Sequence, residues 1–354
     1  MTMRALVSKH PFLIFFILAA LIPVVLVGML LVFPQFFEAI YGGPVNIDQA
    51  ILRAAADAGI DFGPGSNFLT TFIQLCLEEP LLWLLVLGGA APSLAGFIVA
   101  GACSGWGGVR DILIRLRPWL GDAGPGRALR AYALLAFVMI AVELAVYATR
   151  YGLGGEIRAT YTFPENFFSL SLVGGLLLSA FLDQGSFLEE PGWRGFAQPL
   201  LQGRMNSPLA ASLLLGVAWS LWHLPRDIGF GTVEALGLAQ YAFVYLPAFT
   251  ANCVLVSIVA TYFCNLTGGS VIPALMVHGL ANDAVGLAGL STGVTFTPSH
   301  QLTKLAPYLV LVLVLLLLKG RSLGGVVRER DARDDADRVP GSRVLDPRAG
   351  EASC

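Results

Sequence analysis

Long apolar runs are the feature of this chain that most restricts its fold. A stretch of about 20 mostly apolar residues is typical of a helix that crosses a bilayer, and the sequence contains eight such stretches. It therefore predicts an all-α, polytopic membrane protein with about eight transmembrane helices. The expected spans are residues 11–33, 80–104, 129–148, 170–188, 208–223, 240–264, 271–290 and 302–318.

The composition points to the same class of protein. Of 354 residues, 56% are hydrophobic and only 13% are charged, with a mean hydropathy of +0.71, whereas a soluble globular chain carries roughly 25% charged residues. The net charge of −2 is too small to indicate a nucleic-acid partner. The five cysteines are scattered without a Cys-x-x-Cys pair, so they predict neither a disulfide framework nor a zinc knuckle.

Four regions are expected along the chain. The first apolar run is longer than the core of a signal peptide, which is about 7–15 residues, so residues 1–33 should form an N-terminal anchor helix. Residues 34–79 should form an exterior loop with amphipathic segments, including a helix near residues 47–58. Residues 80–318 should be the transmembrane core. The tail, residues 319–354, mixes Arg and Asp with Pro and Gly and is expected to be disordered and cytoplasmic.

The distribution of Lys and Arg predicts the orientation. The loop after the first span is mainly acidic, whereas the loop after the second span and the segment after the last span are basic. With eight spans, basic segments on the inner side place both termini in the cytoplasm, and we expect the plasma membrane of a prokaryote. The basic residues are Arg110, Arg115, Arg117, Arg127, Lys319, Arg321, Arg328 and Arg330.

A first polar cluster interrupts the apolar pattern after the fourth span. A charged side chain at mid-membrane costs about 2.5–3.5 kcal/mol even on a lenient scale, so such residues indicate chemistry or transport. Glu190 and Arg194 are four residues apart and should face each other on a helix. Glu189 points about 100° away and has no local cation, which suits a desolvated general base. Because Pro191 suits a helix start, we expect a new helix there; the plainer alternative is an interfacial charge cluster.

The same three residues, Glu-Glu-Pro, also occur at positions 78–80. There the residue that corresponds to Arg194 is Trp83, and the segment begins a span instead of ending one. We therefore expect Glu78 and Glu79 to be ordinary solvated groups at a membrane edge.

Two further clusters each contain a histidine. Trp219 and His223 are four residues apart and should share a helix face; alone, this histidine fits an interfacial group at a helix end. His278 and Asn282 have the same spacing within the seventh span. They could bind an oxyanion, and the alternative is a hydrogen-bonded pair that packs two helices together.

The three motifs, in this order, resemble the CAAX-processing and bacteriocin-processing (Abi) family of intramembrane endopeptidases, which includes the type II CAAX prenyl endopeptidases. The resemblance rests on Glu-Glu-Pro-Gly-Trp-Arg-Gly at residues 189–195, Trp-x-x-x-His at 219–223 and His-x-x-x-Asn at 278–282. It covers about residues 170–290. One departure is Trp219, where family members often have Phe. The resemblance implies an eight-helix membrane peptidase that acts on a peptide or a membrane protein.

Two mechanisms are compatible with these residues. In the favoured one, Glu189 activates water, His223 helps to hold it, Glu190 and Arg194 orient the site, and His278 and Asn282 bind the oxyanion; no cofactor is required. In the other, zinc is held by Glu189, His223 and His278, since two His and one Glu can leave an open coordination position. No His-Glu-x-x-His motif pairs such ligands on one helix.

Two questions stay open in the sequence. The expected spans place Glu189 near the inner face and His223 near the outer end of a span about 22 Å long, so the two can meet only if the span ends differ from those expected. The alternative function is a non-catalytic membrane protein, either a transporter or an immunity-type binding protein that retains the motif, because intramembrane Glu, Arg and His also mark transport pathways.

Overall fold

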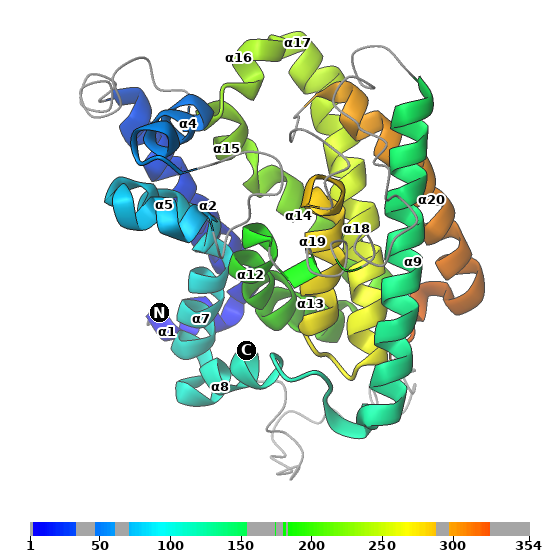
Figure 1. Cartoon of the computed structure of the whole chain (residues 1–354). Coiled ribbons are helices and arrows are strands. Elements are labelled where there is room, and N and C mark those ends of the chain that lie inside the picture. Colours follow the sequence, from blue (N-terminus) through cyan, green and yellow to red (C-terminus); the bar gives the residue numbers. More distant parts are fainter. Residues whose placement is uncertain are drawn as a thin grey trace.

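The computed structural model describes residues 3–32, 47–60, 71–153, 183–287 and 297–325, together with residues 174, 180 and 181. Within them every regular element is a helix (Figure 1), which confirms the predicted all-α class. The main helices are α1 (Met3–Lys9), α2 (Pro11–Val32), α4 (Ile47–Asp57), α5 (Ile73–Glu78), α6 (Trp83–Gly89), α7 (Ala91–Ser104), α8 (Trp106–Ile114), α9 (Gly124–Leu153), α12 (Gln184–Glu190), α13 (Gln198–Met205), α14 (Pro208–Trp222), α15 (Leu224–Gly229), α16 (Thr232–Leu236), α17 (Leu238–Gln240), α18 (Leu246–Leu266), α19 (Ile272–Leu287) and α20 (Pro298–Lys319).

Several helices are suited to cross a membrane. Within the described residues, five segments are long and apolar enough to do so, and α6 with α7 makes a sixth if this pair, bent by 57°, is one span. The predicted span at 170–188 lies mostly outside the described residues, and α19 has only 16 residues. A polytopic membrane protein is therefore confirmed. The five segments are Pro11–Met29, Gly121–Arg150, Pro208–Gly229, Leu238–Leu266 and Pro298–Ser322.

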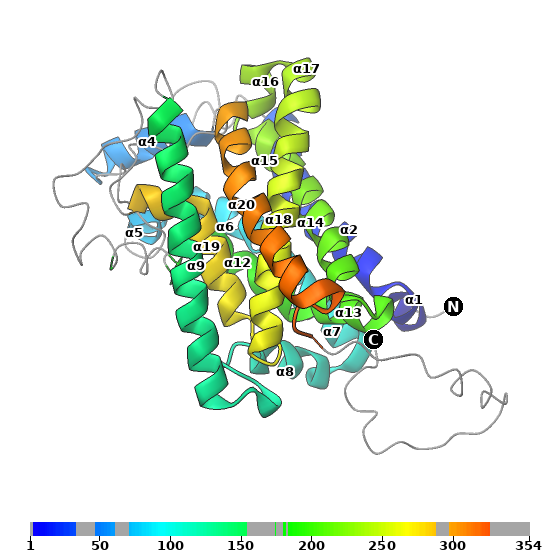
Figure 2. The ribbon, with the colours of Figure 1, turned by 90° about the vertical axis from the view of Figure 1, so that its right-hand side faces the viewer.

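Helix α18 lies in the middle of the bundle. It packs against α14, α20, α19 and α9, and Figure 2 shows these helices running side by side. Most of its residues from Asn252 to Cys264 are buried. The predicted amphipathic helix in the first loop is present as α4, whereas the predicted disordered tail lies almost entirely outside the described residues.

The helix that carries Glu189 and Glu190 starts earlier than the sequence suggested. Asp183 caps α12, and its carboxylate accepts a hydrogen bond from the Ser186 backbone N–H at 2.7 Å. The chain then continues through a π-helical segment, Pro191–Ala197, directly into α13. The expectation of a new helix at Pro191 is wrong. Proline lacks the N–H that an α-helix requires, and the wider π turn accommodates it without ending the helix.

A tight turn follows α13 and reverses the chain into α14. Asn206 adopts a left-handed conformation with φ of 47°, and Ser207 caps α14 by accepting from the Ala210 N–H at 3.2 Å. Along the helices, Glu189 and His223 each lie about 20–25 Å from this turn. The antiparallel hairpin therefore brings them to the same level, and this answers the question of depth that the expected span ends had raised.

The π-helical segment packs closely on α7 through small residues. Gly192 donates its N–H to Ser93 Oγ at 3.2 Å, and a β-carbon at Gly192 would lie 2.2 Å from the carbonyl oxygen of Pro92. A β-carbon at Gly96 would lie 3.2 Å from Gly192 Cα. Such small-residue contacts are typical of helix pairs in membranes, where close approach supplies the packing energy.

We predict that Gly192→Ala destabilises the fold, because the added methyl group would overlap backbone atoms of α7. Overpacking of this kind costs about 1–3 kcal/mol or more, so the variant should melt at a lower temperature and give less folded protein. Gly203→Ala is the matched control, because Gly203 lies in the adjoining helix with no atom near its missing β-carbon. Equal melting temperatures for the two variants would contradict this close contact.

Candidate active site

Five of the six predicted site residues are buried together in the helix bundle. Glu189, Glu190 and Arg194 come from α12 and the π-helical segment, and their exposed fractions are 5%, 0% and 3%. His223 ends α14, and His278 lies on α19; both are buried as well. By contrast, Glu78 is exposed and Glu79 is half-buried, in agreement with the expectation for the other Glu-Glu-Pro sequence.

Glu190 is the centre of a buried ionic cluster. Its Oε1 atom accepts a hydrogen bond from Arg194 Nη1 at 2.7 Å, so the predicted pair is present. His278 Nδ1 lies 2.7 Å from the same oxygen. A proton on Nδ1 makes the ring a donor to the carboxylate and leaves Nε2 available to a ligand. Within the described residues, Glu190 Oε2 and Arg194 Nε and Nη2 have no hydrogen-bond partner.

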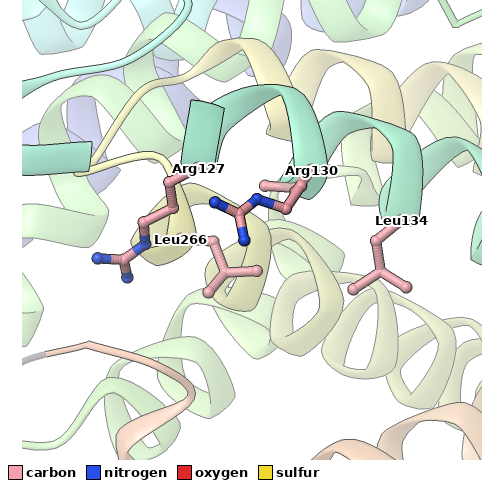
Figure 3. Close-up of a pocket in the computed structure, with 5 residues that line it drawn as sticks. Arg127, Arg130, Leu134 and Leu266 are labelled. Carbon is pink, nitrogen blue, oxygen red and sulfur yellow. The ribbon is translucent and has the colours of Figure 1, made fainter. Parts of the chain in front are cut away.

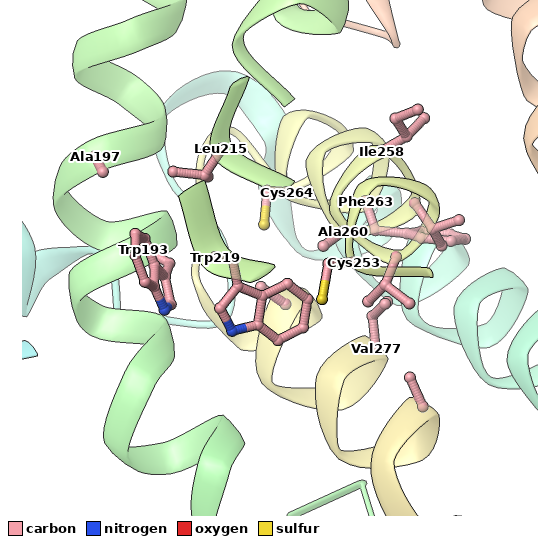
Figure 4. Close-up of a cluster of buried hydrophobic side chains, with 14 of the residues drawn as sticks. Trp193, Ala197, Leu215, Trp219, Cys253, Ile258, Ala260, Phe263, Cys264 and Val277 are labelled. Carbon is pink, nitrogen blue, oxygen red and sulfur yellow. The ribbon is translucent and has the colours of Figure 1, made fainter. Parts of the chain in front are cut away.

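Trp219 joins Glu189 to the rest of this cluster. Its indole N–H donates to Glu189 Oε2 at 2.8 Å, and its ring lies 4.8 Å from the Arg194 guanidinium and 4.8 Å from the His278 ring. Its backbone carbonyl lies 2.8 Å from His223 Nδ1. In Figure 4 the indole nitrogen points toward the helix that carries Trp193. Trp219 is thus both an apolar wall and a hydrogen-bond donor, whereas the sequence analysis placed it only on the helix face of His223.

Three polar atoms converge above Gly185. A β-carbon at this glycine would lie 3.2 Å from Glu189 Oε1, 3.2 Å from Asp183 Oδ1 and 3.3 Å from Asn282 Nδ2. Trp219 donates to the other oxygen, Oε2, and Glu189 Oε1 receives no hydrogen bond from the described part of the chain. The absence of a side chain at position 185 therefore leaves space between a free carboxylate oxygen and an amide donor.

Asn282 lies at the exposed edge of the cluster. Its amide donates to the Asp183 carboxylate at 3.2 Å and 3.4 Å, and its side chain is exposed. His278, one helical turn before it, is buried and contacts Glu190. The two residues share a helix but bind different partners, because α12 presents a carboxylate to each of them.

Comparison with known proteins agrees with this arrangement. Residues 165–284 match the family model described as type II CAAX prenyl endopeptidase Rce1-like. This part of the chain is similar to that family. The chain is also similar to CAAX prenyl protease 2 from Methanococcus maripaludis, with 32% identity over 155 residues, which make up 44% of this chain and 55% of the relative. The chain thus spans about half the length of the curated relative that it matches.

The family match includes all three motifs on which the predicted resemblance rested, and the resemblance is confirmed. The sequence analysis missed one residue of the cluster, Asp183, and one role, that of Trp219 as a donor. Asp183 could have been found as a helix cap, because Asp is a favoured residue immediately before a helix. The donor role of Trp219 has no local signal, because its partner Glu189 lies 30 residues away in the chain.

The residues proposed as zinc ligands meet only part of what such a site needs. His223 and His278 each place Nδ1 against an oxygen, which leaves Nε2 for another partner, as in many metal sites. However, the described residues contain no group of three or more His, Cys, Asp or Glu side chains that could hold a metal ion. Among the described residues, Glu189, His223 and His278 therefore do not form a set of three side chains gathered around one point.

We predict that Arg194→Ala lowers stability strongly, because Glu190 would lose the cation that shares its buried site. Removal of one partner from a buried ion pair costs about 3–5 kcal/mol. The melting temperature should fall, and the double variant Glu190→Gln with Arg194→Met should regain part of the loss. Arg204→Ala, at an exposed position of α13, is the matched control. A melting temperature for Arg194→Ala equal to that of this control would contradict a stabilising pair.

Proposed function

We propose that the protein is an intramembrane endopeptidase of the CAAX type that hydrolyses a peptide bond with water activated by Glu189. The observation that carries the proposal is the free Oε1 of Glu189 beside the Asn282 amide, above Gly185. A catalytic base needs a position from which it can reach both a water molecule and the reacting carbonyl. The buried, family-matched setting of this carboxylate favours catalysis over an interfacial charge cluster.

The first chemical step would be attack by water on the scissile carbonyl. Glu189 Oε1 takes one proton from the water, whose oxygen forms a bond to the carbonyl carbon and converts the carbonyl oxygen to an oxyanion. Trp219 holds Oε2 and so aims Oε1. His223, with Nδ1 at a backbone carbonyl, has Nε2 available to hold the water.

The second step would be collapse of the tetrahedral intermediate. The oxyanion is stabilised by donors placed in advance where charge develops, which is usually the largest catalytic contribution. Asn282 Nδ2 is one donor that the cluster offers, and the His278 ring is a second donor when Nε2 carries a proton in addition to the one on Nδ1. Glu189 then returns its proton to the leaving amine as the C–N bond breaks, and the carboxylate is restored. Glu190 and Arg194 would keep α12 and α19 in register during both steps.

The proposed substrate is a peptide segment presented at the membrane. The matched relative is named a CAAX prenyl protease, and we extend the CAAX class to this chain on the basis of the shared region. We also propose that both termini face the cytoplasm, because the loops with most Lys and Arg lie on one side of the predicted topology. The rival function, a transporter or an immunity-type binding protein, predicts no peptide cleavage by the purified protein.

Glu189→Gln should abolish cleavage of a reporter peptide while the protein remains folded. General base catalysis contributes about 10²–10⁴-fold to rate, so kcat should fall by at least that range. Glu78→Gln, in the same Glu-Glu-Pro sequence but exposed, is the matched control and should retain full activity. If the purified Glu189→Gln variant cleaved the reporter at the wild-type rate, Glu189 would be excluded as the base. The zinc mechanism is tested by elemental analysis of the same active wild-type sample. About one zinc per chain, lost together with activity and restored together with it, would overturn the metal-free mechanism.

Trp219→Phe should lower kcat by about 10–100-fold with little change in KM, because it removes one hydrogen bond to a charged group. The ring that contacts Arg194 and His278 is kept. Trp222→Phe is the control, because the Trp222 N–H donates to the Ala19 carbonyl at 2.9 Å instead of to the cluster. It should lower the melting temperature and leave kcat near the wild-type value. If both variants lost kcat equally, a specific role for the Trp219 N–H would be refuted.

A further inference from the structure

A hollow of about 360 Å³ lies outside the polar cluster, where α9 begins and α18 ends. It is lined by Arg127, Arg130, Ala131 and Leu134 of α9 and by Leu266, the last residue of α18. Figure 3 shows Leu266 below the Arg130 side chain and beside Arg127 in that view. The three apolar residues form its walls, while both guanidinium groups are exposed at its edge.

Positive charge accumulates at this place, and among the described residues Asp122, in the turn before α9, forms no ion pair with either arginine. The first turn of α9 contains no Asp or Glu, and the N-terminal end of a helix carries a partial positive charge of its own. Within the described residues, neither Arg127 nor Arg130 forms an ion pair, and Arg130 donates only to the Gly126 carbonyl at 3.2 Å. A bound anion would offset the repulsion of two cations close to a helix N-terminus.

The surroundings match the boundary between lipid headgroups and acyl chains. Trp119 is exposed, and the Tyr132 hydroxyl donates to the Pro118 carbonyl at 2.6 Å; Trp and Tyr are enriched at this boundary. Farther along α9, Leu134 and Phe137 are exposed at 42% and 73%, as expected of side chains that face lipid. The arginines thus lie at headgroup depth, and Leu134 lies at the start of the apolar zone.

We propose that this hollow binds one anionic phospholipid. Its phosphate would receive hydrogen bonds from Arg127 and Arg130, which suit phosphate because guanidinium donates in pairs. One acyl chain would lie along Ala131, Leu134 and Leu266. The lining contains no carboxylate that could receive the ammonium group of a zwitterionic lipid. The predicted orientation places the hollow in the cytoplasmic leaflet, which carries the anionic lipids.

A lipid in this position would stabilise the connection that leads to the candidate site. Leu266 is followed by the loop that precedes α19, the helix of His278. That loop is held to the segment before α9: Leu120 N–H donates to the Thr267 carbonyl at 3.0 Å, and Ser270 Oγ donates to the Arg117 carbonyl at 2.6 Å. By bridging the start of α9 and the end of α18, the lipid adds a further contact across the same junction.

The test uses the full-length protein purified in neutral detergent. Dioleoyl phosphatidylglycerol, dioleoyl phosphatidylcholine or inorganic phosphate is added, and bound lipid and melting temperature are measured by native mass spectrometry and thermal unfolding. The double variant Arg127→Gln with Arg130→Gln removes both cations of the hollow. Arg110→Gln with Arg117→Gln is the matched control, because it removes two exposed cations of the same basic region outside the hollow.

Wild type and the matched control should bind phosphatidylglycerol alike and melt at least about 3 °C higher with it. The hollow variant should bind it at least about tenfold more weakly. Leu134→Trp fills the hollow and keeps both arginines, so it should also weaken the binding of phosphatidylglycerol. This variant replaces the arginine variant in the test if the latter does not fold. Full-strength binding by either variant would overturn the proposal. So would equal binding of phosphatidylcholine, or the same stabilisation by inorganic phosphate alone.

Discussion

The buried carboxylate of Glu190 is the interaction on which the site depends. An unpaired charge cannot be kept inside an apolar bundle, so Glu190 Oε1 takes one partner from its own helix, Arg194, and one from α19, His278. These two contacts fix α12 against α19. Arg194 also covers the ring of Trp219, whose N–H binds Glu189. The position of the proposed base therefore follows from the pairing of its neighbour.

The packing of the π-helical segment makes this pairing possible. Gly192 lets the helix approach the backbone of α7, and Pro191 is accommodated because the turn there is wider than in an α-helix. The helix can then continue through the glutamates and fold back as α14. A regular α-helix through Pro191 would need an N–H that proline does not have, and a break at that residue would separate Glu190 from Arg194.

The bundle has two polar regions with different chemistry. Around Glu190, opposite charges are paired and nearly all atoms are buried. At the start of α9, charges of one sign are exposed beside apolar walls. The first arrangement suits a reaction that needs exact placement of protons, and the second suits a ligand that brings its own negative charge and an apolar chain. Helix α19 and the loop before it connect the two regions.

The sequence by itself determined the membrane class, most of the helices and the Glu190–Arg194 pair, because each depends on residues close together in the chain. It also supplied the three motifs of the family. Only the tertiary structure decided that Asn282 binds Asp183 and that Trp219 donates to Glu189, since these partners are 99 and 30 residues apart. The different surroundings of the two Glu-Glu-Pro sequences were already predicted from the sequence, because Trp83 stands where the other sequence has Arg194. The periodicity of the sequence predicts which residues share a face of one helix. Whether those side chains are buried, and which distant residues they bind, depends on which helices pack against that face.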